Sequence, residues 1–202
     1  MVKIIRGTAR LETRAGLHYY GTGMRILLID NVDSFTRNLE HLLVSAVDGA
    51  KVDVQTYARL AELDLETPDL IVVSPGPGAP EDYPGYERVF DGPTPVFGVC
   101  LGMQLMNAHR GGETGRLAGC VHGKTDVVRW KGEDEVVARY HSLHVTEVGE
   151  GLAVLASNAQ GVPMCLASDD GHLFGVQFHP ESFLTPNGAR FIHDALESLG
   201  LG

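Results

Sequence analysis

The stretch PVFGVCLGMQLM, residues 95–106, joins an apolar run to a segment with helical spacing and places one cysteine, Cys100, at the junction. The apolar run predicts a buried strand over residues 94–100, and the spacing after it predicts a helix over residues 101–110. A free cysteine is most often a small buried hydrophobic residue. A thiol at the carboxyl end of a strand can instead be a nucleophile, because open α/β sheets bind their ligands at that edge.

Two glycines favour the second interpretation of Cys100. Gly98 and Gly102 lie two residues to either side, and this G-x-C-x-G spacing parallels the nucleophile elbow of serine hydrolases. Small neighbours relieve crowding in such a strained turn. The N-terminus of the following helix would also favour the thiolate over the thiol. We therefore interpret Cys100 as a candidate nucleophile.

The composition restricts the classes of protein to consider. A chain of 202 residues with 44% hydrophobic and 21% charged residues is typical of one well-buried globular domain. The formal net charge of −10 argues against a nucleic-acid or anionic-membrane surface, and no apolar run approaches the ~20 residues that span a bilayer. The three cysteines lie far apart and the N-terminus lacks the apolar core of a signal peptide, so we predict a reduced, cytoplasmic protein.

The first half of the chain predicts alternating strands and helices. In addition to residues 94–100, the predicted strands cover residues 24–30, 51–57 and 68–74. A helix follows the first of them, with Asp33 as its N-cap and with Leu39 and Leu43 on its apolar face. This alternation predicts an α/β fold with a mostly parallel central sheet and helices on both faces.

The second half changes to short strands separated by turn residues, which indicates a mixed or antiparallel extension of the sheet. The predicted strands cover residues 126–130, 135–145, 153–158, 163–168 and 172–179. Trp130 and the KGEDE that follows it, residues 131–135, are interpreted as a solvated hairpin. A final helix is predicted with Asn187 as its cap and Gly200 as its end.

A cysteine nucleophile needs a base and a group that orients the base. The stretch GVQFHPES, residues 175–182, supplies both, because His179 and Glu181 lie two apart after a predicted strand and can point the same way. In isolation the pair would be a surface histidine beside a solvated glutamate. With Cys100 in the same chain, we interpret it as the base and its orienting carboxylate.

The stretch SPGPGAP, residues 74–80, is a third candidate element and also follows a predicted strand. Gly76 and Gly78 let backbone N–H groups approach a substrate, and with the N–H of Leu101 they could form an oxyanion hole for acyl transfer. A phosphate-binding loop is the alternative. The stretch lacks the Gly-Lys-Ser/Thr ending of such loops, and no strongly helical segment follows it.

Six segments, in order along the chain, carry a resemblance to a known family. They are LLIDNVDSFTRNL, SPGPGAPEDYPG, GVCLGMQ, HGKTD, RYHSL and GVQFHPESFLTPNG. From about Met24 to the C-terminus the chain resembles the class I (triad) glutamine amidotransferases, and within them the small subunits of anthranilate synthase and aminodeoxychorismate synthase. The resemblance implies a flavodoxin-like α/β fold, and it implies neither a metal nor an organic cofactor for the glutamine half-reaction.

The resemblance also implies roles for individual residues. Cys100 would attack the side-chain amide of L-glutamine, His179 would act as general base and acid, and Glu181 would orient His179. The residues implied to bind the glutamine and its oxyanion are Gly76, Pro77, Gly78, Leu101, Gln104, Ser142 and Leu143. Three further histidines are interpreted as structural or interface residues rather than metal ligands: His122, His141 and His144.

Residues 1–23 stand outside the amidotransferase pattern, so we place a boundary between an N-terminal extension and an amidotransferase domain, residues 24–202. The extension contains two β-like runs, VKIIRG (2–7) and LHYYGTG (17–23). Its sequence is similar to a hairpin near the end of chorismate-utilising synthase domains. It is therefore interpreted either as the trace of a fusion with such a synthase or as upstream residues without a function.

The implied function is a glutaminase subunit that passes ammonia to a partner, the large subunit of a chorismate-utilising synthase. The product of that partner could be anthranilate, aminodeoxychorismate, or aminodeoxyisochorismate as in phenazine pathways. The alternatives are an amidotransferase for another acceptor, such as a nucleotide, a catalytically silent subunit, and a stand-alone cysteine hydrolase of γ-glutamyl compounds. The presence of Cys100, His179 and Glu181 argues against the silent subunit.

Overall fold

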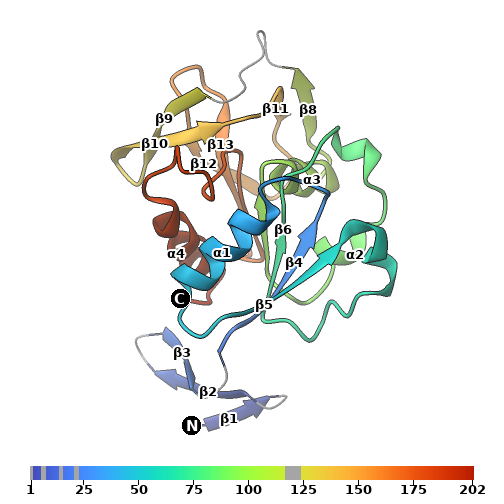
Figure 1. Cartoon of the computed structure of the whole chain (residues 1–202), viewed down its shortest axis with the longest axis vertical. Coiled ribbons are helices and arrows are strands. Elements are labelled where there is room, and N and C mark those ends of the chain that lie inside the picture. The colour runs from blue at the N-terminus through green and yellow to red at the C-terminus, as the bar shows by residue number, and fades with distance from the viewer. Residues whose placement is uncertain (1, 6–7, 14–15, 21–22, 117–123) are drawn as a thin grey trace.

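A seven-stranded sheet forms the centre of the protein (Figure 1). The computed structural model describes residues 23–116 and 124–202 with their side chains, and the backbone of residues 2–5, 8–13 and 16–20. The strand order is β12-β13-β14-β7-β6-β4-β5, with parallel pairing from β14 to β5 and antiparallel pairing from β12 to β14. The strands are β4 (Arg25–Asp30), β5 (Lys51–Thr56), β6 (Leu70–Val73), β7 (Val96–Val99), β12 (Leu152–Ser157), β13 (Pro163–Ser168) and β14 (Leu173–Val176). The predicted parallel sheet with an antiparallel extension is confirmed.

Helices cover both faces of this sheet, as the sequence predicts. The helices are α1 (Thr36–Ala46), α2 (Glu87–Phe90), α3 (Leu101–His109) and α4 (Gly188–Ser198), and the 3-10 turns are η1 (Tyr57–Glu62) and η2 (Pro80–Asp82). Alternate residues of the central strands face opposite sides: in β4, Leu28 joins the cluster that contains α1 and α4, whereas Leu27 joins the cluster that contains α3. Burial on both faces explains why the central strands are continuous apolar runs. Among the helices of the described residues, none is long and apolar enough to cross a membrane.

Two smaller antiparallel pairs lie beside the carboxyl edge of the sheet. One is β9 (Lys124–Trp130) with β10 (Glu133–Arg139), and the other is β8 (Glu113–Arg116) with β11 (Leu143–Glu147). The sequence predicts one strand over residues 135–145, but the structure breaks it at residues 140–142. At the break the His141 ring nitrogen Nδ1 lies 2.6 Å from the Leu143 carbonyl, and the Arg139 Nε donates to His141 Nε2 at 3.2 Å. These local hydrogen bonds hold the backbone in a turn at residues 140–142, so strand pairing stops there.

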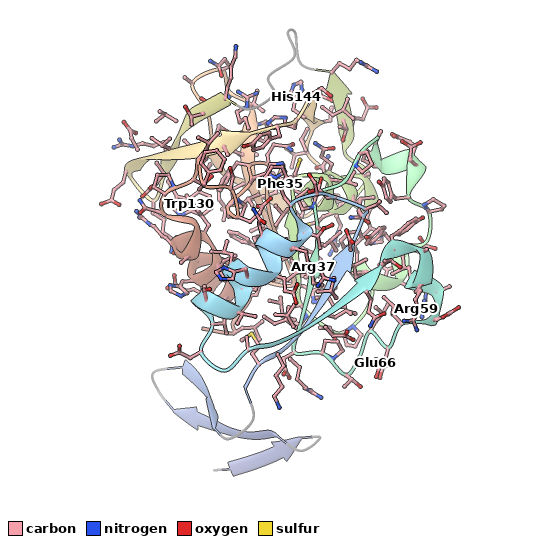
Figure 2. The ribbon with its side chains drawn as sticks, viewed as in Figure 1. Phe35, Arg37, Arg59, Glu66, Trp130 and His144 are labelled. Carbon is pink, nitrogen blue, oxygen red and sulfur yellow. The ribbon has the colours of Figure 1, made fainter. Side chains whose placement is uncertain are left out.

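The prediction of a solvated hairpin is wrong for Trp130. Its side chain is buried, its ring centroid lies 4.8 Å from that of Phe191, and its Nε1 donates to Asp194 at 2.7 Å. Figure 2 shows Trp130 beside α4. Residues 131–134 are exposed as expected, but Glu135 is buried, because its carboxylate accepts a hydrogen bond from Asn187 at 2.9 Å and pairs with Arg190. Trp130 is buried because α4 offers it both aromatic contacts and an acceptor for its N–H.

The predicted N-cap of the first helix is also corrected. The helix α1 begins at Thr36, and the carboxylate of Asp33 instead accepts the N–H of Phe35 at 2.7 Å in a turn before the helix. Asp30 accepts the hydroxyl of Thr36 at 2.7 Å and the N–H of Val32 at 2.9 Å. The carboxylate that ends β4 therefore organises this turn, and Phe35 is brought to the carboxyl edge of the sheet.

The N-terminal residues form three strands rather than the two runs that the sequence predicts. They are β1 (Val2–Ile5), β2 (Thr8–Thr13) and β3 (Gly16–Tyr20), paired in that order as an antiparallel sheet. Within the strands that the structure describes, none of the three pairs with the seven-stranded sheet. The stretch HGKTD begins at His122, which with Cys120 lies outside the described residues.

Candidate active site

Cys100 forms the turn between β7 and α3, as the sequence predicts. Its backbone has φ 54° and ψ −101°, a conformation that costs a non-glycine residue about 1–3 kcal/mol and that is found mainly at functional sites. A Cβ added to Gly98 would lie 2.5 Å from the backbone of Gly102, and one added to Gly102 would lie 2.4 Å from the Val73 carbonyl oxygen. The two glycines therefore let strand and helix approach closely enough to hold the thiol in a sharp elbow.

His179 and Glu181 form a buried pair after β14. The His179 Nδ1 lies 2.7 Å from Glu181 Oε1, and the Glu181 carboxylate is fully enclosed. The backbone of His179 is held on both sides, since its N–H donates to the Ala138 carbonyl at 3.1 Å and its carbonyl accepts the Thr185 hydroxyl at 2.7 Å. The bridge to Ala138 explains why β14 ends at Val176, before the predicted end at residue 179.

The charge state of His179 follows from these partners. Burial disfavours the imidazolium, but the charge of Cys100 and hydrogen bonds with Cys100 and Glu181 outweigh it, so the pKa of His179 is raised well above its ordinary value. The second oxygen of Glu181, Oε2, is buried without a hydrogen-bond partner among the described residues. The imidazolium is thus the direct counter-charge of that carboxylate and faces the sulfur with its other nitrogen.

Aromatic rings fix the plane of the His179 imidazole. The ring of Tyr140 stands edge-on to it at a centroid distance of 5.0 Å, and the ring of Phe35 does so at 5.7 Å. The Tyr140 hydroxyl in turn lies 3.2 Å from the Ser182 hydroxyl. Figure 2 shows Phe35 above the N-terminal end of α1. Neither ring was singled out from the sequence, because an aromatic residue in a connecting segment has no chemical signature of its own.

A cavity of about 230 Å³ opens over the thiol. It is lined by nine of the ten predicted site residues: Gly76, Pro77, Gly78, Cys100, Leu101, Gln104, Ser142, Leu143 and His179. The tenth, Glu181, lies behind His179 and reaches the cavity only through it. Five further residues line the cavity that were not predicted to bind the substrate: Asp33, Phe35, Pro75, Tyr140 and His141.

The loop after β6 contributes Pro75, Gly76, Pro77 and Gly78 to the lining of this cavity. The Tyr83 hydroxyl donates to the Pro77 carbonyl at 2.9 Å, and the Asp82 carboxylate accepts the Ala79 N–H at 2.9 Å. Gly78 has φ +79°, and a Cβ there would meet the Asp82 carboxylate at 2.4 Å. The loop is therefore held in place by Asp82 of η2 and by Tyr83, which follows η2.

Gln104 is oriented by two acceptors. Its Nε2 donates to the Leu143 carbonyl at 3.1 Å and to the Gln177 Oε1 at 3.0 Å. An amide nitrogen carries two hydrogens, so both are used within the protein. The group that Gln104 offers to a ligand is its carbonyl oxygen, an acceptor.

His141, beside Gln104 in the cavity lining, is held neutral. Burial lowers its pKa from 6.5 to about 4, and the positive charge of Arg139 adds to this, whereas the hydrogen bond to the Leu143 carbonyl opposes it. The Arg139 Nε donates to His141 Nε2, so the neutral ring carries its proton on Nδ1 and donates it to Leu143. His141 thus supports the Leu143 carbonyl that orients Gln104.

Replacing His141 with glutamine is expected to reduce the acid sensitivity of folding. Between about pH 6.5 and about pH 4 the unfolded wild-type chain binds a proton at residue 141 that the folded chain does not bind. Stability therefore falls as the pH falls through this window, by up to about 3 kcal/mol, and this contribution is absent in His141→Gln. Urea unfolding from pH 4 to pH 8 measures how the free energy of unfolding changes with pH in the wild type and in His141→Gln. Equal pH dependence in the two proteins would contradict a neutral, buried His141.

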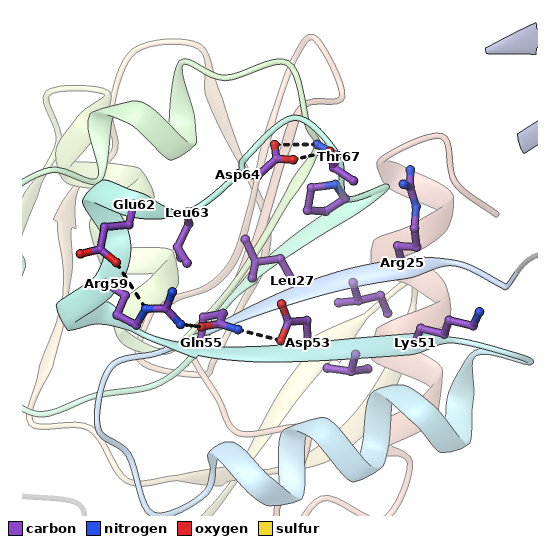
Figure 3. Close-up of a pocket in the computed structure, with 13 residues that line it drawn as sticks. Arg25, Leu27, Lys51, Asp53, Gln55, Arg59, Glu62, Leu63, Asp64 and Thr67 are labelled. Atoms are coloured by element: carbon purple, nitrogen blue, oxygen red, sulfur yellow. Dashed lines mark hydrogen bonds and ion pairs between the residues drawn. The ribbon is translucent and has the colours of Figure 1, made fainter. Parts of the chain in front are cut away.

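A second and larger hollow, about 490 Å³, lies over β4, β5 and η1 (Figure 3). In it Arg59 donates to Gln55 at 2.7 Å and lies 3.5 Å from Glu62, and Gln55 donates to Asp53 at 2.9 Å. The described residues that line it include no cysteine and no histidine. It therefore lacks the thiol and imidazole that the smaller cavity contains.

The structure is that of an α/β protein whose smaller cavity brings together a thiol and an imidazole, with a carboxylate behind the imidazole. A family model of class-I glutamine amidotransferases matches residues 27–199. The chain is 40% identical over 187 residues to a relative from Pseudomonas aeruginosa, "Anthranilate synthase component 2, pyocyanine specific", and the match covers 86% of this chain and 93% of the relative. The chain belongs to the class-I glutamine amidotransferase family.

Two further similarities concern the sequence and the fold. The chain is 41% identical over 183 residues to the "Aminodeoxychorismate synthase" of Streptomyces griseus, and this match covers 84% of this chain but 25% of that longer protein. A putative GMP synthase subunit from Thermoplasma acidophilum superposes with a TM-score of 0.74 at 18% identity, covering 89% of this chain and 96% of that one. The structural likeness supports the fold alone, and it confirms the predicted flavodoxin-like α/β architecture.

Proposed function

We propose that the chain hydrolyses L-glutamine through Cys100, His179 and Glu181 and delivers the ammonia to a chorismate-utilising synthase. The observation that carries the proposal is the strained elbow of Cys100, whose sulfur faces an imidazole that is hydrogen-bonded to a buried glutamate. Residues in strained backbone conformations cluster at active sites, where the strain is part of the function. The half-reaction needs no metal and no organic cofactor.

The first half of the reaction forms a thioester. The Cys100 thiolate attacks the side-chain amide carbon of glutamine, and the oxygen becomes an oxyanion that the N–H groups of Gly78 and Leu101 stabilise. The carbon–nitrogen bond then breaks, and His179 gives its proton to the leaving nitrogen, which departs as ammonia. The raised pKa of His179 suits this step, because the proton is already present when the thiolate attacks.

The second half releases glutamate. His179, now neutral, takes a proton from a water molecule that attacks the γ-glutamyl thioester. The carbon–sulfur bond breaks and the thiolate is restored beside the imidazolium. Glu181 holds the ring in place through Nδ1 during both halves and stabilises its positive charge.

Recognition of glutamine uses the remaining lining residues. Gln104 presents an acceptor, which suits the α-ammonium group of the substrate. Ser142 and Leu143 line the same cavity, as do Gly76, Pro77 and Gly78, and the proposal assigns the backbone of these residues to contacts with the glutamine. A short, polar amino acid fits a cavity of about 230 Å³.

The identity of the partner rests on the relatives. One is named as component 2 of an anthranilate synthase and another as an aminodeoxychorismate synthase, so we propose that the partner, which accepts the ammonia in the cytoplasm, is the large subunit of such a synthase. The product would be anthranilate or aminodeoxychorismate, with aminodeoxyisochorismate as the phenazine-type alternative. Residues 1–23 would be an N-terminal extension derived from a fused synthase domain, in line with their separate three-stranded sheet.

The test measures glutamate release by the purified chain, alone and with candidate large subunits supplied with chorismate. Activity that rises with one large subunit, with an aromatic product identified by mass spectrometry, would support the proposal and name the product. Glutamate release that is the same with and without every candidate large subunit would contradict the proposal. The same assay with a chain that starts at Met24 is expected to give the same rate, and a loss would mean that the extension takes part in docking or catalysis.

A stand-alone hydrolase of γ-glutamyl compounds is the second candidate. It is favoured by one observation, that the His179–Glu181 bond and the cavity are already formed in the single chain. Full turnover of γ-glutamyl peptides without a partner would support this candidate over the amidotransferase.

A further inference from the structure

Gln177 is a fully buried polar residue beside the nucleophile that the mechanism above does not use. It follows β14 directly, and its backbone N–H donates to the Met164 carbonyl at 3.0 Å. It lies outside the cavity lining, so its side chain does not touch a ligand there. A buried amide is costly unless its polar atoms are satisfied, so the partners of Gln177 indicate what the side chain does.

The two ends of the Gln177 amide bind two different parts of the site. Its Oε1 accepts a hydrogen bond from Gln104 Nε2 at 3.0 Å, and its Nε2 donates to the Cys100 sulfur at 3.6 Å. The acceptor bond fixes which end of the amide is oxygen, and therefore the N–H must point at the sulfur. One side chain thus joins the residue that would orient the substrate to the atom that would attack it.

We propose that Gln177 is a positioning residue that holds the Cys100 thiolate by hydrogen bonding and couples its alignment to Gln104. The proposal rests on the proposed function for its link to glutamine, but the contact with the sulfur does not depend on the substrate. A thiolate carries a full negative charge and accepts an N–H well, whereas a thioester sulfur accepts it poorly. Gln177 therefore stabilises the state that attacks and the state that leaves when glutamate is released.

His179 and Gln177 act on the same sulfur in different ways. His179 must exchange a proton during each turnover, so its hydrogen bond with the sulfur changes from step to step. The Gln177 amide has no proton to give up at any working pH, so it remains a donor throughout the turnover. A permanent donor keeps the side chain of Cys100 in one orientation while the imidazole changes its charge.

Two substitutions separate the two ends of the amide. Gln177→Glu keeps an acceptor for Gln104 but replaces the donor to the sulfur by a carboxylate. Gln177→Met keeps the length of the side chain and removes both ends. The order of thiolate reactivity is expected to be wild type, then Gln177→Met, then Gln177→Glu.

The direct readout is the rate at which iodoacetamide alkylates Cys100, followed by peptide mass spectrometry so that the other cysteines do not contribute. At pH 7 the rate is expected to fall about tenfold in Gln177→Met and further in Gln177→Glu, because a hydrogen bond to a charged group is lost. This measurement needs neither glutamine nor a synthase.

The kinetic readout is a crossed pattern in glutamine hydrolysis. Gln177→Glu is expected to lower kcat more than Gln177→Met does, because the carboxylate repels the thiolate. Gln177→Met is expected to raise KM more, because Gln104 loses an acceptor that Gln177→Glu retains. A general loss of stability would make the same variant the worse one in both kcat and KM. It cannot make one variant worse in kcat and the other worse in KM.

Thr94→Val is the matched control, since it removes one buried hydrogen bond, from the Thr94 hydroxyl to the Leu65 carbonyl at 2.7 Å, at the opposite end of β7. It is expected to leave the alkylation rate unchanged at a similar loss of melting temperature. Alkylation rates in both Gln177 variants equal to the wild-type rate, in folded protein, would overturn the positioning role. Slower alkylation in a chain that hydrolyses no glutamine with any partner would keep this role and reject the proposed function.

Discussion

Replacing Cys100 with serine is expected to lower glutamine hydrolysis by about 10⁴-fold, because a serine hydroxyl keeps its proton at neutral pH whereas the reaction needs a thiolate. Glutamine binding is expected to persist, because the lining residues that contact the substrate are unchanged. The substitution hardly changes the size of the side chain, so the melting temperature should stay close to the wild-type value. Glutamate release measures the first effect and isothermal titration with glutamine the second.

Cys165→Ala is the control for this substitution. Cys165 is fully buried in the core, and burial, with a smaller effect of the Asp194 charge, raises the pKa of its thiol well above the ordinary value. It is therefore an unreactive core residue, and Cys165→Ala should keep the activity while losing some stability. Activity that survives Cys100→Ser, or that disappears in Cys165→Ala without unfolding, would mean that the nucleophile is assigned to the wrong thiol.

Replacing Gly102 with alanine is expected to destabilise the protein by about 3 kcal/mol and to lower any remaining activity about 100-fold. The new Cβ would lie 2.4 Å from the carbonyl oxygen of Val73, which belongs to a central strand and cannot move aside. The preference of a helix for alanine over glycine, about 1 kcal/mol, acts in the opposite direction and is smaller. The helix α3 must shift away from β6, and the thiol at its N-terminus shifts with it.

Gly111→Ala separates this clash from the general cost of changing a glycine. Gly111 has φ +79° and no atom within 4 Å of an added Cβ, so the substitution costs only the backbone strain, about 1 kcal/mol. Urea unfolding and glutamate release on both variants give the comparison. A Gly102→Ala variant as stable as Gly111→Ala would show that α3 and β6 can separate without loss, against the tight elbow described above.

Much of the site could be predicted because its signals are local in the sequence. An elbow needs small residues two positions before and after its centre, and Gly98 and Gly102 satisfy this within five consecutive residues. The pairing of His179 with Glu181 needs only two residues and one intervening proline. The Gly76 and Gly78 loop was identifiable because a proline and glycine-rich stretch at a strand end can form neither helix nor central strand.

Other features could not be predicted because their partners are distant in the sequence. Trp130 was assigned to a solvated hairpin together with the residues that follow it, yet it is buried by contacts with α4, more than sixty residues away. Asp33 was assigned as a helix cap, but the carboxylate of Asp30 organises that turn. The strand β8 has no alternation of apolar residues and exists because β11 pairs with it.

The sequence by itself determined the α/β class, the elbow around Cys100 and the pairing of His179 with Glu181. The hydrophobic periodicity, the glycine spacing and the His-x-Glu pair that indicate them each lie within a short stretch of consecutive residues. Only the tertiary structure decided which buried groups surround the sulfur. Gln177 is 77 residues from Cys100 and 73 from Gln104 along the chain, and it meets both because β14 lies next to β7 in the sheet. A strand order of this kind results from the packing of the whole sheet against its helices, and no stretch of a few residues contains it.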